Sequence, residues 1–287
     1  MKNIKILALT LCSMAGMCSC DFMEQNKPLV NYVGKAIASE IKSEIPGLPE
    51  PSAAPAMATA DDKLQMQTSP EGTDEQILRR TGYTVSYNKT TKLPNWVAWH
   101  LTASRMQGPA KRSGVDFEAD PEVPAPRAED SDYYGSGYDR GHMCPAADNK
   151  WSKKAMEESF LFTNMCPQNG NLNRGDWNEM EMACRNWAKE YGGVYIVCGP
   201  ILYNWKHKTI GKNKVVVPEA FFKVVLRTGD NPKAIGFIYK NAEGNRPKGD
   251  YVNTVDEVER ITGIDFFPSL PDNVENRVEA TADLNDW

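Results

Sequence analysis

The chain has 287 residues, of which 41% are hydrophobic and 25% are charged. This is the composition of ordinary globular proteins, and it excludes a collagen, a coiled coil and a wholly disordered chain. The 33 Lys and Arg against 38 Asp and Glu give a net charge of -5. That balance argues against a protein that coats nucleic acid through general basicity, but it allows a local basic groove.

The first 19 residues have the pattern of a signal peptide. A start with two lysines is followed by a mostly apolar run over residues 6–17, which is too short to span a bilayer as a helix. The stretch 17–20, Met-Cys-Ser-Cys, resembles the lipobox of bacterial lipoproteins, with Cys20 as the lipidated residue. We therefore expect an exported cell-envelope lipoprotein, on the periplasmic or the surface side. The alternative is an ordinary secreted protein.

Two segments are expected after the signal peptide. Residues 20–72 show little hydrophobic periodicity, and residues 46–62 are rich in Pro, Ala, Ser and Glu. We interpret 20–72 as a flexible tether and 73–287 as the folded domain. Four cysteines lie in that domain: Cys144, Cys166, Cys184 and Cys198. In an exported chain they permit two disulfides, and free buried thiols are the alternative.

The patterns in the folded domain predict strands and helices without a regular alternation. Strands are expected over 83–87, 95–102, 193–198, 214–217, 220–227 and 234–239. Residues 105–137 carry several Pro, Gly and Asp and are expected to form a loop. Apolar residues at helical spacing predict a helix over 176–191, which a Gly-Gly pair ends. Thr254 and Glu257 form a capping box that opens a short helix, closed by Gly263. This mixture predicts an α+β fold with a central antiparallel sheet and flanking helices.

Two short blocks contain the residues that can carry chemistry. In Asp139-Arg140-Gly141-His142, a neutral imidazole can act as a general base, and an arginine can neutralise an anionic oxygen. In the second block, residues 163–181, the side chain of Asn173 offers a neutral oxygen. Glu181 lies about 80° further around the axis if one helix carries both. Such a donor pair suits Mg²⁺, which keeps most of its waters, and suits Zn²⁺ poorly. A base, a hydrated Mg²⁺ and an arginine together describe phosphodiester hydrolysis.

The two blocks resemble the signature of the DNA/RNA non-specific endonuclease family, nucleases of the His-Me finger or ββα-metal type. The residues that carry the resemblance stand in register: Asp139-Arg140-Gly141-His142, Asn164, Pro167-Gln168, Leu172-Asn173, Trp177 and Glu181. The likeness covers roughly residues 75–270. It implies a ββα-metal active-site motif and a Mg²⁺ cofactor, with Mn²⁺ as an alternative. It further implies cleavage of DNA and RNA that leaves 5′-phosphates.

The resemblance also implies a role for each residue. His142 matches the general base that activates water, and Asn173 matches the single protein ligand of the metal. Arg140 matches a phosphate-binding arginine. Asn164 matches an amide that positions the histidine and the substrate. Glu181 matches the carboxylate that holds the waters of the metal.

Two further expectations follow from the same resemblance, and a third is a separate hypothesis about the cysteines beside the motifs. Asp139 opens the first motif and is expected to be structural. The family has another arginine upstream, and Arg112 fills that place by the longer spacing, whereas the shorter spacing falls near Val115, which cannot serve. Cys144 and Cys166 flank the motifs, and a disulfide between them would tie the hairpin to the following segment.

Each assignment has a simpler alternative. His142 would be a buried structural histidine, Arg140 an ion-pair partner, Asn173 a helix N-cap with Asp176 at N3, and Glu181 a solvated helix residue. For the whole chain, the alternative is a catalytically weak nucleic-acid-binding surface lipoprotein. A thiol redox protein is a weaker alternative, since no C-x-x-C motif supports it. The sequence does not specify an oligomeric state.

The remaining histidines are expected to be structural or on the surface. His100 lies in an apolar strand pattern, and His207 lies between two lysines in a predicted surface loop. The lysines that follow the first motif, Lys150, Lys153 and Lys154, would either concentrate positive charge near the site or form an ordinary solvated face.

Overall fold

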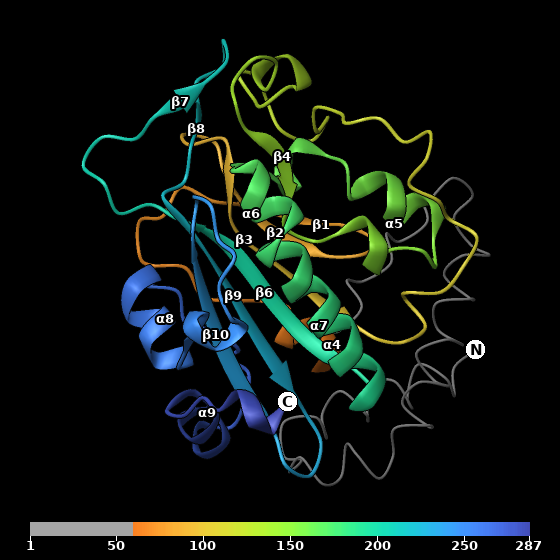
Figure 1. Ribbon diagram of the computed structural model, residues 1–287, viewed down its shortest axis with the longest axis vertical. Helices are drawn as coiled ribbons and strands as arrows, with labels where there is room; N and C mark the ends of the chain where they lie inside the picture. Colours follow the sequence, from red (N-terminus) through yellow and green to blue (C-terminus); the bar gives the residue numbers. More distant parts are fainter. Residues whose placement is uncertain (1–59) are drawn as a thin grey trace, which may run out of the picture. The chain divides into compact units, whose positions relative to one another are not determined.

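The computed structural model describes residues 60–287, arranged around one large sheet (Figure 1). The expected signal peptide, the lipidation site Cys20 and the tether up to residue 59 lie outside the described residues. The sheet has seven strands, each antiparallel to its neighbours. In spatial order they are β1 (Gln76–Arg79), β2 (Thr84–Asn88), β3 (Leu93–Leu101), β6 (Val194–Ile201), β9 (Ala220–Arg227), β10 (Lys233–Lys240) and β11 (Val252–Asn253). The predicted α+β class with a central antiparallel sheet is confirmed.

Two small antiparallel pairs stand outside the sheet. They are β4 (Asp139–His142) with β5 (Met165–Gln168), and β7 (Thr209–Ile210) with β8 (Val215–Val216). The α-helices are α4 (Ala60–Leu64), α5 (Lys153–Glu158), α6 (Gly170–Arg174), α7 (Asp176–Glu190), α8 (Val255–Thr262) and α9 (Asp272–Glu279). No helix within residues 60–287 is long and apolar enough to cross a membrane.

The sheet is buried on both faces. On β3, Trp96 and Ala98 belong to the apolar cluster that includes α8 and α9 residues, whereas Val97 and Trp99 belong to the cluster that includes α7 residues. Because successive side chains of a strand point to opposite faces, a strand covered on both sides must be apolar throughout. This explains the near-continuous apolar runs, and it makes α7 one layer and α8 with α9 the other (Figure 1).

Most predicted elements are confirmed, and the exceptions have local causes. The 105–137 segment is irregular apart from one 3₁₀ turn, Asp130–Asp132. Strand β6 runs past the expected stop at Gly199-Pro200, because there it pairs with β9 alone and a proline lacking N–H costs no ladder bond. One half of the predicted capping box is formed, with Thr254 Oγ1 accepting from Glu257 N at 3.2 Å, whereas the Glu257 carboxylate accepts from Arg260; Gly263 ends α8 at φ 71°.

The folded part begins earlier than the expected boundary at residue 73. Asp61 of α4 accepts from Tyr195 Oη at 2.6 Å and lies 2.6 Å from His100 Nδ1. Thr68 forms a β-bridge with Asp265. Residues 60–72 are therefore not tether. Their polar composition concealed this, because they attach through a few side-chain contacts and one backbone bridge rather than through a periodic apolar face.

Candidate active site

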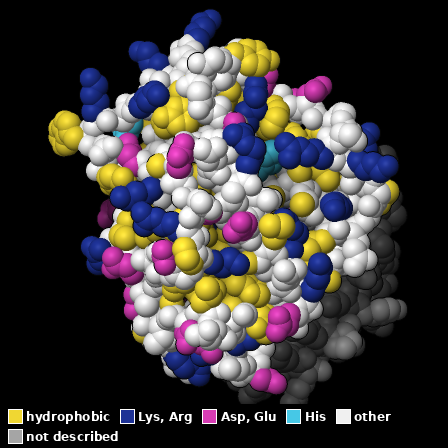
Figure 2. Space-filling view, in the orientation of Figure 1, with side chains coloured by type: hydrophobic (Ala, Val, Ile, Leu, Met, Phe, Trp, Pro, Cys, Tyr) yellow, Lys and Arg dark blue, Asp and Glu magenta, His cyan; other side chains and the backbone are white. Residues whose placement is uncertain are grey.

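One cleft brings the two sequence blocks together. It has a volume of about 970 Å³ and is lined by β4, the loop before it, the segment that follows it, and the facing sides of α6 and α7. Six cationic side chains line it: Lys111, Arg112, Arg140, Lys150, Arg174 and Arg185. Only two anionic side chains do so: Asp139 and Glu181. Figure 2 shows Lys and Arg gathered on either side of a partly visible histidine. The expected basic groove therefore exists on a chain whose net charge is -5.

Strand β4 aims two side chains of the first motif into this cleft. Arg140 and His142 are two residues apart on a strand, so they share a face, and both line the cleft. Gly141 lies between them, against Gln168 of β5. A Cβ at Gly141 would lie 2.4 Å from Gln168 Oε1 and 2.6 Å from its Cβ. The glycine is therefore required for the close approach of the two strands.

The His142 imidazole is buried, neutral and unpartnered at one nitrogen. Its ring packs edge-on against Phe160 at 5.0 Å between centroids and tilted against Phe117 at 5.6 Å. Burial, and then the charge of Arg112, lowers the pKa of His142 to about 3. Nε2 has no hydrogen-bond partner among the described residues. A structural histidine would have its nitrogens satisfied, whereas a base needs a free lone pair next to its substrate.

Asp139 orients the amide of Asn173. Asp139 Oδ2 accepts from Asn173 Nδ2 at 3.0 Å and from Arg174 Nη1 at 2.6 Å. The structural role expected for Asp139 is thus observed, and the amide oxygen of Asn173 is left for another ligand. The N-cap alternative for Asn173 is wrong, because Asn173 lies inside α6 and the N-cap of α7, which begins at Asp176, is Gly175. Asn173 and Glu181 also do not share one helix, since the backbone breaks at Gly175 between α6 and α7.

Glu181 is a buried carboxylate on α7 that also lines the cleft. Its side chain is 13% exposed, so the alternative of a solvated helix residue is wrong. Burial raises the pKa of Glu181 to about 7, although nearby cations oppose the shift. Arg185 Nη1 lies 3.9 Å from Glu181 Oε2 and donates to Asp148 Oδ1 at 3.1 Å. Asp148 Oδ2 in turn accepts from Trp99 Nε1 at 3.2 Å.

A buried lysine that sequence reasoning missed lies behind these carboxylates. Lys223 of β9 is 1% exposed, and its Nζ lies 4.1 Å from the centroid of the Trp177 ring and 5.5 Å from that of Trp99. Lys223 is the largest cationic influence on the pKa of Glu181. The signal was present in the sequence, because Lys223 is the only charge inside the apolar run 220–226.

Both candidate arginines reach the cleft. The Arg112 guanidinium lies 5.6 Å from the centroid of the Phe160 ring. Arg112 lines the cleft, whereas Val115 does not. Arg140 Nε donates to Asp130 Oδ1, and its guanidinium lies 5.2 Å from the Phe117 ring centroid. Arg140 therefore forms the ion pair of the simpler alternative and still presents its other nitrogens to the cleft.

Asn164 does not reach the cleft. Its side chain is fully buried, accepts from Cys144 N at 2.9 Å, and donates to Cys144 O and Ser159 O, both at 2.8 Å. The expected contact with substrate is thus corrected: this amide holds the backbone two residues after His142. Asn164 occupies the expected position in the family motif, but the spacing of the motif does not predict that its side chain is buried.

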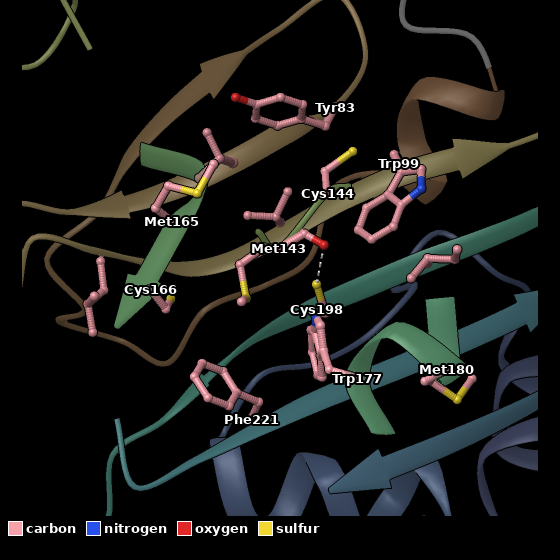
Figure 3. Close-up of a cluster of buried hydrophobic side chains, with 14 of the residues drawn as sticks. Tyr83, Trp99, Met143, Cys144, Met165, Cys166, Trp177, Met180, Cys198 and Phe221 are labelled. Atoms are coloured by element: carbon pink, nitrogen blue, oxygen red, sulfur yellow. Dashed lines mark hydrogen bonds between the residues drawn. The ribbon is translucent and has the colours of Figure 1, made fainter. Parts of the chain in front are cut away.

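The four cysteines are free thiols in the larger apolar core, and Figure 3 labels three of them, Cys144, Cys166 and Cys198. The expected disulfide between Cys144 and Cys166 is therefore wrong. Cys198 Sγ donates to Met143 O at 3.4 Å, and Cys144 Sγ accepts from Asn149 Nδ2 at 3.3 Å. Burial raises the pKa of Cys144 and Cys166, so these thiols behave as small apolar side chains.

The other two histidines lie outside the cleft. His100 stacks on Tyr195 at 4.2 Å between ring centroids and pairs with Asp61. His207 Nδ1 lies 2.9 Å from Glu219 Oε1. Of the lysines after the first motif, Lys150 lines the cleft, whereas Lys153 and Lys154 pair with Glu157 and Glu158 along α5.

Comparison with known proteins matches residues 61–273 to the DNA/RNA non-specific endonuclease family. The mitochondrial nuclease EXOG of Danio rerio is 38% identical over 210 residues, 66% of this chain and 60% of that protein. The mitochondrial endonuclease G of Homo sapiens is 34% identical over 209 residues, 68% of this chain and 70% of that protein. The crystal structure of an EndoG/EndoGI complex aligns with a TM-score of 0.67 at 30% identity, covering 70% of this chain and 89% of that chain. The chain spans only 56% to 66% of the length of the EXOG proteins it matches.

Proposed function

The chain belongs to the DNA/RNA non-specific endonuclease family, and we propose that it is a Mg²⁺-dependent, sugar-non-specific endonuclease that hydrolyses DNA and RNA to 5′-phosphate products. One observation carries the proposal. A neutral imidazole with an unpartnered nitrogen shares a cation-lined cleft with an amide whose oxygen is free to bind a ligand. The similarity to EXOG and endonuclease G supports the same activity.

His142 is the general base in this proposal. Its Nε2 takes a proton from a water molecule whose oxygen attacks the phosphorus. The bond from phosphorus to the 3′ oxygen breaks, the phosphate stays on the 5′ oxygen, and the 3′ oxygen takes a proton from a solvent water molecule and leaves as a hydroxyl group. The low pKa of His142 keeps the imidazole neutral before substrate arrives. An anionic phosphate in the cleft offsets the charge of Arg112 and raises the proton affinity of His142 when the base is needed.

The arginines hold the phosphate. Arg140 is fixed at Nε by Asp130, so its remaining donors are oriented without further loss of side-chain entropy when substrate binds. Arg112 and Lys150 add charge along the same cleft. Contacts to phosphate carry no information about base or sugar, which is consistent with activity on both DNA and RNA.

The donors present fit a hard divalent cation. The free oxygen of Asn173 and the carboxylate of Glu181 line one cleft, and the cleft contains no cysteine ligand. Asn173 would hold Mg²⁺, or Mn²⁺ in its place, and Glu181 would hold its waters. When bound, the cation supplies positive charge that offsets the negative charge developing on the phosphate and on the leaving oxygen.

The first experiment is digestion of plasmid DNA and of RNA by the purified protein, with Mg²⁺ and with EDTA. We expect cutting of both substrates in Mg²⁺ and none in EDTA. His142→Ala and Asn173→Ala should lower the rate by about 10²-fold or more without loss of fold. Lys153→Ala, a cation outside the cleft, is the matched control and should cut normally. Binding without cutting by folded wild type in Mg²⁺ would instead support the weakly catalytic binding protein.

We further propose that the chain is exported and anchored in the cell envelope by lipid at Cys20. The apolar run over 6–17 and the lipobox-like stretch 17–20 support this. Growth with a labelled fatty acid tests it: label should enter the wild-type chain and be absent from Cys20→Ser. Incorporation that survives this substitution would refute the assignment of Cys20.

A further inference from the structure

Three carboxylates converge between α8 and α9, in the layer on the opposite face of the sheet from α7. Asp256 and Glu259 come from α8, and Glu279 is the last residue of α9. One oxygen from each lies within 4.8 Å of the others. Like charges this close repel each other, so the arrangement requires a positive charge or bound protons.

The chain supplies no cation to this cluster among the described residues. Arg260, the one arginine of α8, is held by Glu257 at 2.6 and 2.8 Å. No ion pair within residues 60–287 joins Asp256, Glu259 or Glu279 to a basic side chain. The charge of the cluster is therefore not compensated by the protein.

Glu279 is the most buried of the three carboxylates. It is only 6% exposed, and its Oε1 is buried without a hydrogen-bond partner. It stands at the carboxyl end of α9, where the helix dipole makes a negative charge unfavourable. One turn earlier on the same helix, Glu275 Oε1 is also buried and unpartnered. A buried, unpartnered carboxylate that shares its cluster with two others requires either a proton or a cationic ligand.

The donor chemistry selects the type of cation. The set contains only carboxylate oxygens, which favour Ca²⁺, Mg²⁺ or Mn²⁺ over Zn²⁺. A Ca²⁺ ion with bonds of about 2.3–2.6 Å places opposite oxygens about 4.6–5.2 Å apart, and it tolerates irregular geometry. Mg²⁺ draws opposite oxygens to about 4.0–4.2 Å and requires a regular octahedron.

We propose that Asp256, Glu259 and Glu279 form a Ca²⁺ site that ties α8 to α9. Glu259 is already oriented, because its Oε1 accepts from Phe266 N at 2.8 Å. The neighbouring residues Val255, Val258 and Val278 belong to the apolar cluster on this face of the sheet. The site would therefore stabilise the packing of the C-terminal layer. It is independent of the proposed nuclease activity.

Thermal unfolding of the full chain in the Asn173→Ala background tests the site, because that substitution removes the proposed metal ligand in the cleft. After EDTA treatment and dialysis, we expect 5 mM CaCl₂ to raise Tm by several degrees. Glu279→Gln should abolish this shift and should itself raise Tm in EDTA, because the repulsion is gone. Asp256→Asn, at an exposed position, should also reduce the Ca²⁺ shift.

A control variant at the end of another helix completes the test, and three outcomes would contradict the proposal. Glu190→Gln changes the last residue of α7, an equivalent helix end outside the cluster, and should leave the Ca²⁺ shift unchanged. An equal shift in Glu279→Gln and in its parent would overturn the proposal. So would a parent protein that CaCl₂ does not stabilise but acidification does, since protons would then neutralise the cluster. A larger shift with MgCl₂ than with CaCl₂ would overturn the assignment of Ca²⁺.

Discussion

Buried carboxylates occur in both layers of the molecule, but their surroundings differ. Burial raises the pKa of Glu181 beside the cleft to about 7 and that of Glu279 in the α8–α9 layer to about 8. The second largest influence on the pKa has opposite signs at Glu181 and at Glu279. Lys223 lowers the pKa of Glu181, whereas Glu259 raises that of Glu279. The cleft thus carries its own cations and is prepared for an anionic ligand. Within residues 60–287, no ion pair joins the clustered carboxylates of the opposite layer to a basic side chain.

In the cleft, Asp139 holds the amide of Asn173, the proposed metal ligand. Asp139→Ala should lower the nuclease rate about 10- to 100-fold and raise the Mg²⁺ concentration needed for half-maximal rate, because the Asn173 amide loses its orienting partner. Arg174→Ala removes the other partner of Asp139, a cation that also lines the cleft, and should leave the Mg²⁺ concentration needed for half-maximal rate unchanged. Initial rates over a Mg²⁺ titration would separate the two variants. Equal behaviour would mean that Asp139 does not position the ligand.

Beside the cleft, Lys223 is the cation that most lowers the pKa of Glu181. Lys223→Met should destabilise the fold by about 3 kcal/mol, because it removes a buried cation that acts on both Glu181 and Asp148 and leaves them with Arg185. Urea unfolding measures the loss. Adding Glu181→Gln to Lys223→Met should recover part of it, since one uncompensated charge is removed. Strict additivity of the two substitutions would show that the charges do not interact.

His142 predicts a dependence of stability on pH. Its pKa is lowered from 6.5 to about 3 in the folded chain, so below about pH 6.5 the unfolded chain binds a proton that the folded chain does not. The free energy of unfolding should therefore fall as pH falls from about 6.5 towards 3. His142→Gln should flatten this slope in urea titrations at pH 7, 6, 5 and 4. An unchanged slope would show that the imidazole is protonated in the folded chain.

The smallest effects are expected from substitution of single lysines. They should differ between a lysine inside the cleft and one outside it. Lys150→Ala should weaken DNA binding modestly and lower the slope of log K against log salt by about one. Lys153→Ala should change neither, and its exposed pair with Glu157 contributes no more than about 0.5 kcal/mol to stability. Filter binding in EDTA at several salt concentrations measures both. Equal slopes would show that the cleft is not the binding surface.

Local patterns predicted much of the fold and of the site. The strands over 83–87 and 220–227 and the helix opened by Thr254 were recognisable because alternation, helical spacing and capping act between near neighbours. The order and spacing of the two motifs likewise predicted that His142 and Asn173 would share a site. Strand β1 and helix α9 were missed, because both have mixed polarity and acquire their burial from distant partners.

By itself, the sequence determined the strand pattern and the residues of the two family motifs, and it predicted an imidazole beside oxygen donors. Only the tertiary structure decided that Asn164 lies beneath the cleft, that the cysteines are free thiols, and that Lys223 compensates Glu181. It also decided that Glu279 meets two carboxylates of another helix. The physical reason is common to these findings. Charge compensation, burial and sulfur pairing depend on distances between residues far apart in the chain, and no local periodicity encodes those distances.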